Sequence, residues 1–229
     1  MASLCAEMDL PIHIHLLEDK SDDELSIERY GMSPESRLTI RNLFKPGAII
    51  VHGVHLSESK LRKSQESGAF MVNNPRSNMN NRVGLAMVGH GEWALGTDGI
   101  DSDILAEARA SFFRGREDDP PLDWMAPMNM PKRSQQMRGR PCGLKLATLA
   151  EGTTADITFL DYDPPTPLDG DNFSGHLYFG LGSYACTSTM VNGKWVMKDR
   201  ELVTVDERDI LKKSREGAKR LYKKMGADT

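Results

Sequence analysis

Four short apolar segments that alternate with polar helical segments most constrain the fold of this 229-residue chain. The apolar segments lie within residues 11–18, 48–51, 69–72 and 92–96, and helices are predicted at 19–29, 34–44, 58–67 and 101–114. Strands that alternate with helices in this way are typical of βα units around a parallel sheet. We therefore expect an α/β fold whose functional loops follow the carboxyl ends of the strands, as in a (β/α) barrel.

The first apolar segment, Pro-Ile-His-Ile-His-Leu-Leu-Glu, carries two histidines at alternate positions. In a strand, His13 and His15 project from the same face. Glu18 would fall on the opposite face if the strand continued, so it approaches His15 only if the strand ends and the chain turns. The alternative is that one histidine is a hydrogen-bonded core residue and Glu18 begins the next acidic helix.

The other three segments also run into polar or titratable residues. His52 ends the second segment, the amide-rich run 73–81 follows the third, and Asp98 lies in the Leu-Gly-Thr-Asp-Gly sequence after the fourth. The carboxyl ends of parallel strands meet at one edge of a sheet, where α/β proteins place their chemistry. The sequence therefore predicts that these groups gather in one site.

Composition excludes several classes of function. A formal net charge of −4 argues against a general nucleic-acid or membrane-surface partner. The three cysteines are scattered and form no Cys-x-x-Cys pair, which fits a reducing cytoplasm and neither a disulfide framework nor a thiolate zinc site. No apolar run approaches the roughly 18 residues of a membrane span, and the start has no signal-peptide pattern. We expect a cytoplasmic protein.

The second half of the chain follows a different pattern. Residues 115–141 have weak periodicity and are predicted to be a long, partly mobile connection. Strands are expected at 155–160 and 176–179, a hairpin around Asn192-Gly193, and a terminal helix at 207–225. We divide the chain into a partial barrel with its connecting segment, 1–141, and a β unit with a terminal helix, 142–229.

These motifs, in this order and at barrel-unit spacing, resemble the amidohydrolase superfamily from about residue 5 to the C-terminus. The resemblance is greater to the branch of cytosine deaminases, chlorohydrolases and S-adenosylhomocysteine deaminases. The run 73–81 is similar to that of aminohydrolases linked to selenium metabolism within this branch. The implied fold is the C-terminal half of a metal-dependent (β/α)8 TIM barrel, strands five to eight, followed by part of a small β-sandwich and a C-terminal helix.

The resemblance also implies roles for the residues at the strand ends. His15 and Asp98 would ligate one divalent metal, zinc rather than iron, and Asp98 would also accept the proton of the attacking water. Glu18 would protonate the ring nitrogen of the substrate, and His52 would orient substrate and water. Further substrate contacts would come from Asn74, Ser77 and Asn78.

The implied reaction is hydrolysis of a carbon–nitrogen bond other than a peptide bond. Deamination or dechlorination of a small heterocyclic substrate requires a water that ionises near neutral pH, which a divalent metal supplies. It also requires an acid for the ring nitrogen and a base for the proton of the water.

Part of the family pattern has no match in this chain. Members of the branch supply a His-x-His pair from strand one and then strands two to four. This chain would have only two of the metal ligands, which hold zinc weakly, and only four strands, which do not close a barrel. One alternative is therefore a truncated, catalytically inactive fragment or a scaffold without activity. A second is one half of a split enzyme whose partner chain supplies strands one to four. A third is a homo-oligomer in which two copies pair edge to edge and assemble a new site. In that alternative, His13, His15, His52 and Asp98 would make a four-ligand set within one chain.

Overall fold

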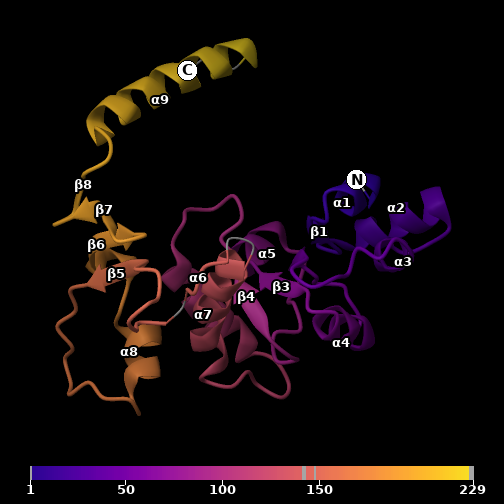
Figure 1. Cartoon of the computed structure of the whole chain (residues 1–229), viewed down its shortest axis with the longest axis horizontal. Helices are drawn as coiled ribbons and strands as arrows, with labels where there is room; N and C mark the ends of the chain where they lie inside the picture. Colours follow the sequence, from indigo (N-terminus) through magenta and orange to yellow (C-terminus); the bar gives the residue numbers. More distant parts are fainter. Residues whose placement is uncertain (1, 141–142, 147, 227–229) are drawn as a thin grey trace. The chain divides into compact units, whose positions relative to one another are not determined.

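A computed structural model describes residues 2–140, 143–146 and 148–226 of the chain (Figure 1). The chain forms two compact units. The first comprises residues 1–153 and 164–183, and the second comprises 154–163 and 184–229. The domain boundary predicted between residues 141 and 142 lies outside the described residues.

A four-stranded parallel sheet forms the centre of the first unit. Its strands are β1 (His13–Leu16), β2 (Ile49–His52), β3 (Phe70–Asn73) and β4 (Trp93–Leu95), hydrogen-bonded in the order β1-β2-β3-β4. The predicted alternation of strands and helices is confirmed, because each strand pairs in parallel with the next one along the chain. The carboxyl ends of all four strands therefore meet at one edge of the sheet.

Helices precede, separate and follow the strands of this sheet. They are α1 (Ala2–Glu7), α2 (Lys20–Tyr30), α3 (Pro34–Ile40), α4 (Glu58–Glu66), α5 (Pro75–Asn81) and α6 (Ile104–Gly115). Asp19 and Asp103 begin α2 and α6 as N-caps, each accepting a backbone hydrogen bond in the first turn. The third helix ends at Ile40, before the predicted position 44, and the chain leaves it through Asn42, whose φ is +51°.

The two faces of the sheet bury different residues. Ile50, Met71 and Trp93 are in register on one face and belong to a core that includes Leu61 of α4 and Ala108 of α6. On the opposite face, the neighbouring set in register forms a smaller cluster, Val51, Val72 and Ala94. His15 pairs with Val51 in the sheet, so this second face also carries the paired histidines of β1.

The prediction of a long mobile connection at 115–141 is wrong, because α7 (Ala126–Gly139) occupies much of it. Met130, Ser134 and Met137 lie on one side of α7, at the helical spacing of four and three residues. Met130 is buried, Met137 packs against the Val51 cluster, and the Ser134 hydroxyl lies 2.9 Å from both N and O of Leu95. Because a serine interrupts the apolar stripe and prolines lie near the start and within the helix, the sequence conceals this period.

The strand predicted at 176–179 is also wrong. These residues belong to α8 (Phe173–Phe179). The Tyr178 ring stacks on Phe112 of α6, with centroids 4.0 Å apart and 5° between the planes, and its hydroxyl donates to Trp124 O at 2.6 Å. Packing of a helical aromatic face thus overrides the strand preference of a His-Leu-Tyr-Phe sequence.

The second unit contains a small antiparallel sheet of β5 (Ile157–Leu160), β6 (Cys186–Val191), β7 (Lys194–Lys198) and β8 (Glu201–Leu202). The predicted hairpin is confirmed. Asn192 and Gly193 join β6 to β7 with φ values of +49° and +73°, as a type I′ turn requires. The terminal helix α9 (Glu207–Lys224) begins at the N-cap Asp206, whose side chain accepts a hydrogen bond from Asp209 N.

None of the helices in the described part of the chain is both long and apolar enough to cross a membrane.

Replacing Ser134 with alanine tests the contact between α7 and β4. We expect the free energy of unfolding to fall by about 1–3 kcal/mol, because the backbone N–H and C=O of the buried Leu95 lose a hydrogen-bond partner. Urea denaturation measures the change. The exposed Ser102→Ala is the matched control and should stay within about 0.5 kcal/mol of the parent; equal losses in both variants would contradict this account of α7.

Candidate active site

Three strand ends turn sharply at non-glycine residues with left-handed backbone. The φ values are +51° at Leu17, just after β1, +68° at His52 and +50° at Asp98. Such conformations cost on the order of 1–3 kcal/mol each and cluster at functional sites. Here they direct side chains from separate strands into one space at the carboxyl edge of the sheet.

His52 lies at the centre of this space and is completely buried. Its Nε2 atom is 3.5 Å from Glu18 Oε2 and 3.7 Å from Asp98 Oδ2. The rings of His15 and His52 meet edge to face, with centroids 4.8 Å apart. The structure therefore brings His15, Glu18, His52 and Asp98 together, although 80 residues separate Glu18 from Asp98 in the sequence.

Glu18 reaches the site through the turn at Leu17. Because β1 ends at Leu16 and Leu17 is left-handed, Glu18 does not continue the alternation of the strand. Its backbone N–H donates to Asp22 Oδ2 at 2.9 Å, and its Oε1 accepts from Asn81 Nδ2 at 3.0 Å. The strand thus ends and the chain turns before Glu18, which is the condition for its carboxylate to approach His15.

Asp98 is held by two hydrogen bonds to its carboxylate. The Ser77 hydroxyl donates to Oδ2 at 2.7 Å and the Gly99 N–H donates to Oδ1 at 2.8 Å. The hydrogen bond from Ser77 is the largest cause of a lowered Asp98 pKa, with further contributions from Gly99 and the two nearby histidines. The carboxylate is therefore ionised at neutral pH and suited to bind a cation or to accept a proton.

The amide-rich run contributes through different contacts at different positions. Ser77 holds Asp98, and Asn78 Oδ1 lies 2.9 Å from Nδ1 of His52. Asn74 is buried away from this cluster, where its amide nitrogen can donate to the Gly96 and Asn73 carbonyls. Asn81 donates to Glu18. The sequence marks Asn81 only as the last residue of the amide-rich run, without indicating which group it contacts.

Arg76 anchors the start of α5 against α6. Its guanidinium donates to Asp101 Oδ1 at 2.5 Å and, through Nε, to the buried Glu107 Oε1 at 2.7 Å. The hydrogen bond to Asp101 is the main cause of a raised Arg76 pKa. This ion-pair network positions the helix that carries Ser77 and Asn78, and it lies outside the cluster around His52.

The ligand atoms of His15, Glu18 and His52 lie within 4.8 Å of one another, which makes this trio a candidate metal group among the described residues. The buried Nε2 of His52 has no hydrogen-bond partner among the described residues. A buried polar atom is normally hydrogen-bonded or bound to an ion, so this nitrogen is a candidate ligand. Imidazole nitrogens and carboxylate oxygens are zinc ligands. The donor set thus fits a zinc ion. His13 lies one strand repeat away and is not part of the trio.

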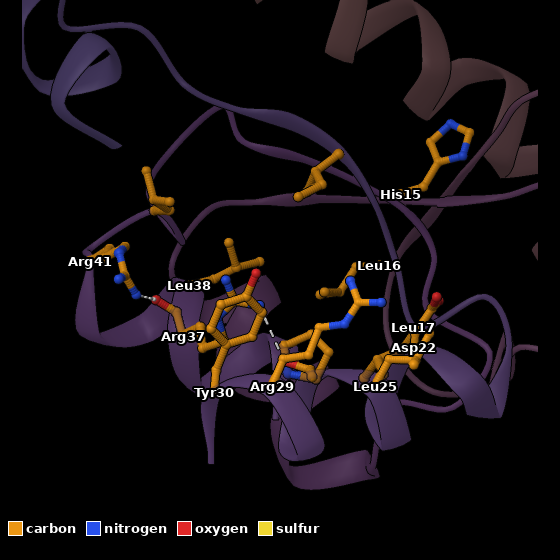
Figure 2. A pocket seen from close by; sticks show the side chains of 14 residues that line it. His15, Leu16, Leu17, Asp22, Leu25, Arg29, Tyr30, Arg37, Leu38 and Arg41 are labelled. Atoms are coloured by element: carbon orange, nitrogen blue, oxygen red, sulfur yellow. Dashed lines mark hydrogen bonds between the residues drawn. The ribbon is translucent and has the colours of Figure 1, made fainter. Parts of the chain in front are cut away.

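A separate pocket of about 490 Å³ lies beside β1, lined mainly by α2 and α3 (Figure 2). Arg29, Tyr30 and Arg37 contribute to its wall, and the His15 ring points away from the other lining side chains. On this side β1 has no hydrogen-bonded neighbour within the described part of the chain. The pocket therefore lies along an unpaired sheet edge and shares His15 with the cluster around His52.

Comparison with known proteins identifies the class to which this fold and site belong. Residues 1–127 match the model of the amidohydrolase family, and the chain belongs to that family. The curated relatives that it matches are named methylthioadenosine/S-adenosylhomocysteine deaminases.

Two curated relatives illustrate the similarity. The 5-methylthioadenosine/S-adenosylhomocysteine deaminase of Desulforudis audaxviator is 29% identical over 94% of this chain and 53% of its own length. The enzyme of the same name from Desulforamulus reducens is 30% identical over 96% of this chain and 53% of its own. The chain thus spans about half the length of the curated relatives it matches.

Solved structures show the same fold. An adenosine deaminase from Xanthomonas campestris with bound zinc aligns with a TM-score of 0.83 at 22% identity, over 96% of this chain and 53% of that one. Atrazine chlorohydrolase from Arthrobacter aurescens, complexed with zinc, aligns with a TM-score of 0.76 at 23% identity, over 94% and 50%. The chain therefore aligns to about half of these amidohydrolase structures.

Replacing Ser77 with alanine should raise the Asp98 pKa, because the largest cause of its lowering is removed. Carboxyl-carbon NMR over an acid titration measures the shift, with Ser59→Ala as a control that does not contact Asp98. In the parent, the stabilisation from ionised Asp98 is complete above the unfolded pKa of about 3.9 and is lost as the pH falls through the lower folded pKa. An unchanged Asp98 pKa in Ser77→Ala would contradict the assigned contact.

Proposed function

We propose that this chain is the catalytic-residue-bearing half of a metal-dependent amidohydrolase that deaminates or dechlorinates a small heterocycle. The convergence of His15, Glu18, His52 and Asp98 at the ends of β1, β2 and β4 carries this proposal. Family membership supports the class of reaction. The names of the curated relatives favour a purine nucleoside as substrate.

In this proposal His15 and Asp98 hold one zinc ion, and the buried Nε2 of His52, which has no hydrogen-bond partner, is a further donor available to it. Nitrogen and oxygen donors accept zinc and iron alike, and zinc is favoured because related structures contain it. When bound, the metal would lower the pKa of water toward neutrality and polarise the bond under attack.

The protein side chains then divide the proton transfers. Asp98, ionised through its bond to Ser77, accepts a proton from the attacking water. Glu18, oriented by Asn81, delivers a proton to the ring nitrogen next to the carbon under attack. His52 orients both reactants from its buried position. A new carbon–oxygen bond forms, and the proton that Asp98 took from water passes to the amino group. The carbon–nitrogen bond then breaks and ammonia leaves, while the new hydroxyl returns a proton to Glu18; in the chloro analogue, chloride leaves.

We assign the four parallel strands to positions five to eight of the barrel and the small antiparallel sheet to part of the family's β-sandwich, within the proposed divisions 1–141 and 142–229. Strands one to four would come from a segment outside these 229 residues, from a partner chain, or from a second copy. The unpaired edge of β1 and the pocket beside it favour a further strand at this place. The amide-rich run 73–81 favours the aminohydrolases linked to selenium metabolism as the nearest subgroup.

Zinc titration of the purified chain tests the proposed metal site. We expect His15→Ala to weaken zinc binding at least about tenfold, because one nitrogen ligand is lost. His13→Ala is the matched control and should bind as the parent does, since His13 belongs neither to the trio nor to the contacts that bring Glu18, Asp98 and His15 to His52. Isothermal calorimetry gives both affinities. Equal losses in the two variants would instead favour a four-ligand set that includes His13, and no binding by the parent would contradict the site in this chain.

Ammonia release from 5′-methylthioadenosine and S-adenosylhomocysteine, and chloride release from a chlorotriazine, test the reaction. We expect activity when the zinc-loaded chain is co-expressed with the first half of a relative such as that of Desulforudis audaxviator. Glu18→Gln should then reduce kcat about 10²- to 10⁴-fold, because the proton donor is removed. Absence of activity in every combination would favour the alternative of an inactive fragment or scaffold.

A further inference from the structure

A series of hydrogen-bonded, buried polar side chains runs from the site into the core of the first unit. It consists of His52, Asn78, Asn73 and Ser111, and we call it the relay. Nδ1 of His52 lies 2.9 Å from Oδ1 of Asn78, Nδ2 of Asn78 lies 3.4 Å from Oδ1 of Asn73, and Nδ2 of Asn73 lies 3.4 Å from Oγ of Ser111. His52, Asn73 and Ser111 are fully buried and Asn78 is 2% exposed. No water is needed to connect them, and the reaction proposed above assigns no role to Asn73 or Ser111.

The far end of this relay gives it a direction. The Ser111 hydroxyl lies 3.5 Å from the Met130 sulfur, which offers only an acceptor, so the hydroxyl donates there and accepts from Asn73. Asn73 then accepts from Asn78 through Oδ1. Asn78 is left with Oδ1 toward His52, and a carboxamide oxygen accepts only. The contact at 2.9 Å therefore requires a proton on Nδ1 of His52.

The opposite side of the ring supports the same arrangement. Nε2 is buried, has no hydrogen-bond partner, and lies more than 3.2 Å from both carboxylates that face it. A proton at Nε2 would find no acceptor within the usual hydrogen-bond distance. A lone pair at Nε2 is the form that binds a metal or accepts a proton from substrate or water.

We propose that Asn78, oriented by Asn73 and Ser111, is a positioning residue that keeps the proton of neutral His52 on Nδ1 and presents the Nε2 lone pair to the site. Asn78 acts through His52 and does not itself touch the reacting atoms. This inference deepens the proposed function and rests on it for its catalytic meaning. The tautomer itself is a property of the metal-free chain.

Nitrogen-15 NMR of the histidine rings tests the tautomer at one fixed, mildly alkaline pH without metal. The His52 signals are identified by their absence in His52→Gln. In the parent we expect a protonated Nδ1 and an unprotonated Nε2. In Asn78→Asp, which keeps an acceptor opposite Nδ1, the same tautomer should persist. In Asn78→Leu, which removes the acceptor, the share of the Nε2-protonated tautomer should rise.

Two further variants keep the test decisive. Asn129→Leu places the same substitution at an exposed position on α7 and should leave His52 unchanged. Ser111→Ala removes only the end of the relay and should raise the Nε2-protonated share less than Asn78→Leu does; it replaces Asn78→Leu if that variant does not fold. An Nε2-protonated ring in the parent, or a tautomer that neither variant alters, would overturn the proposal.

Zinc binding separates this inference from the proposed function. We expect Asn78→Leu to weaken zinc binding about 10- to 100-fold and Asn78→Asp to retain it, because orienting partners of metal-binding histidines contribute on that scale. If the parent has the predicted tautomer but binds no zinc and gives no active enzyme, the role of the relay is supported and the proposed function is contradicted. If the parent binds zinc, but neutral His52 carries its proton on Nε2 in the metal-free chain, the role of the relay is contradicted and the proposed function is not.

Discussion

The buried imidazole of His52 is the group on which the rest of the site depends. Burial without a partner would be costly for a ring with two polar nitrogens. Asn78 satisfies one nitrogen, and the other faces Glu18 and Asp98. The left-handed backbone of His52 itself, at φ +68°, turns the ring into this position at the end of β2. Packing around the ring thus offsets the strain in the backbone. Nε2 is the ring nitrogen that remains available to the site.

Parallel topology explains why residues distant in sequence meet there. Each strand pairs with the next in register, so the loops after β1, β2, β3 and β4 open at the same edge. Acidic, imidazole and amide groups come from these separate loops, and hydrogen bonds from α5 then fix the carboxylates. Asn81 holds Glu18, and Ser77 holds Asp98. One short helix therefore orients both acids of the site.

The match of residues 1–127 to the family model places this architecture within the amidohydrolase family. The four strands form an open sheet with two different edges. Along β4, α7 lies against the strand and Ser134 bonds the backbone of Leu95. Along β1, the described residues provide no neighbouring strand, and a pocket lined partly by arginines lies beside the edge. The two edges of the sheet are therefore covered by different elements, α7 along β4 and a pocket along β1.

The sequence alone determined the alternation of four strands with helices, the Asn192-Gly193 hairpin, and the titratable groups at the strand ends, because hydrophobic period and turn residues are local signals. Tertiary structure decided the rest. The helix α7 exists because Met130, Ser134 and Met137 meet the sheet, and α8 exists because Tyr178 stacks on Phe112. No local pattern reveals that Leu17 turns Glu18 back toward the histidines, or that Asn78 contacts His52, since both depend on groups brought together only when the strands pair.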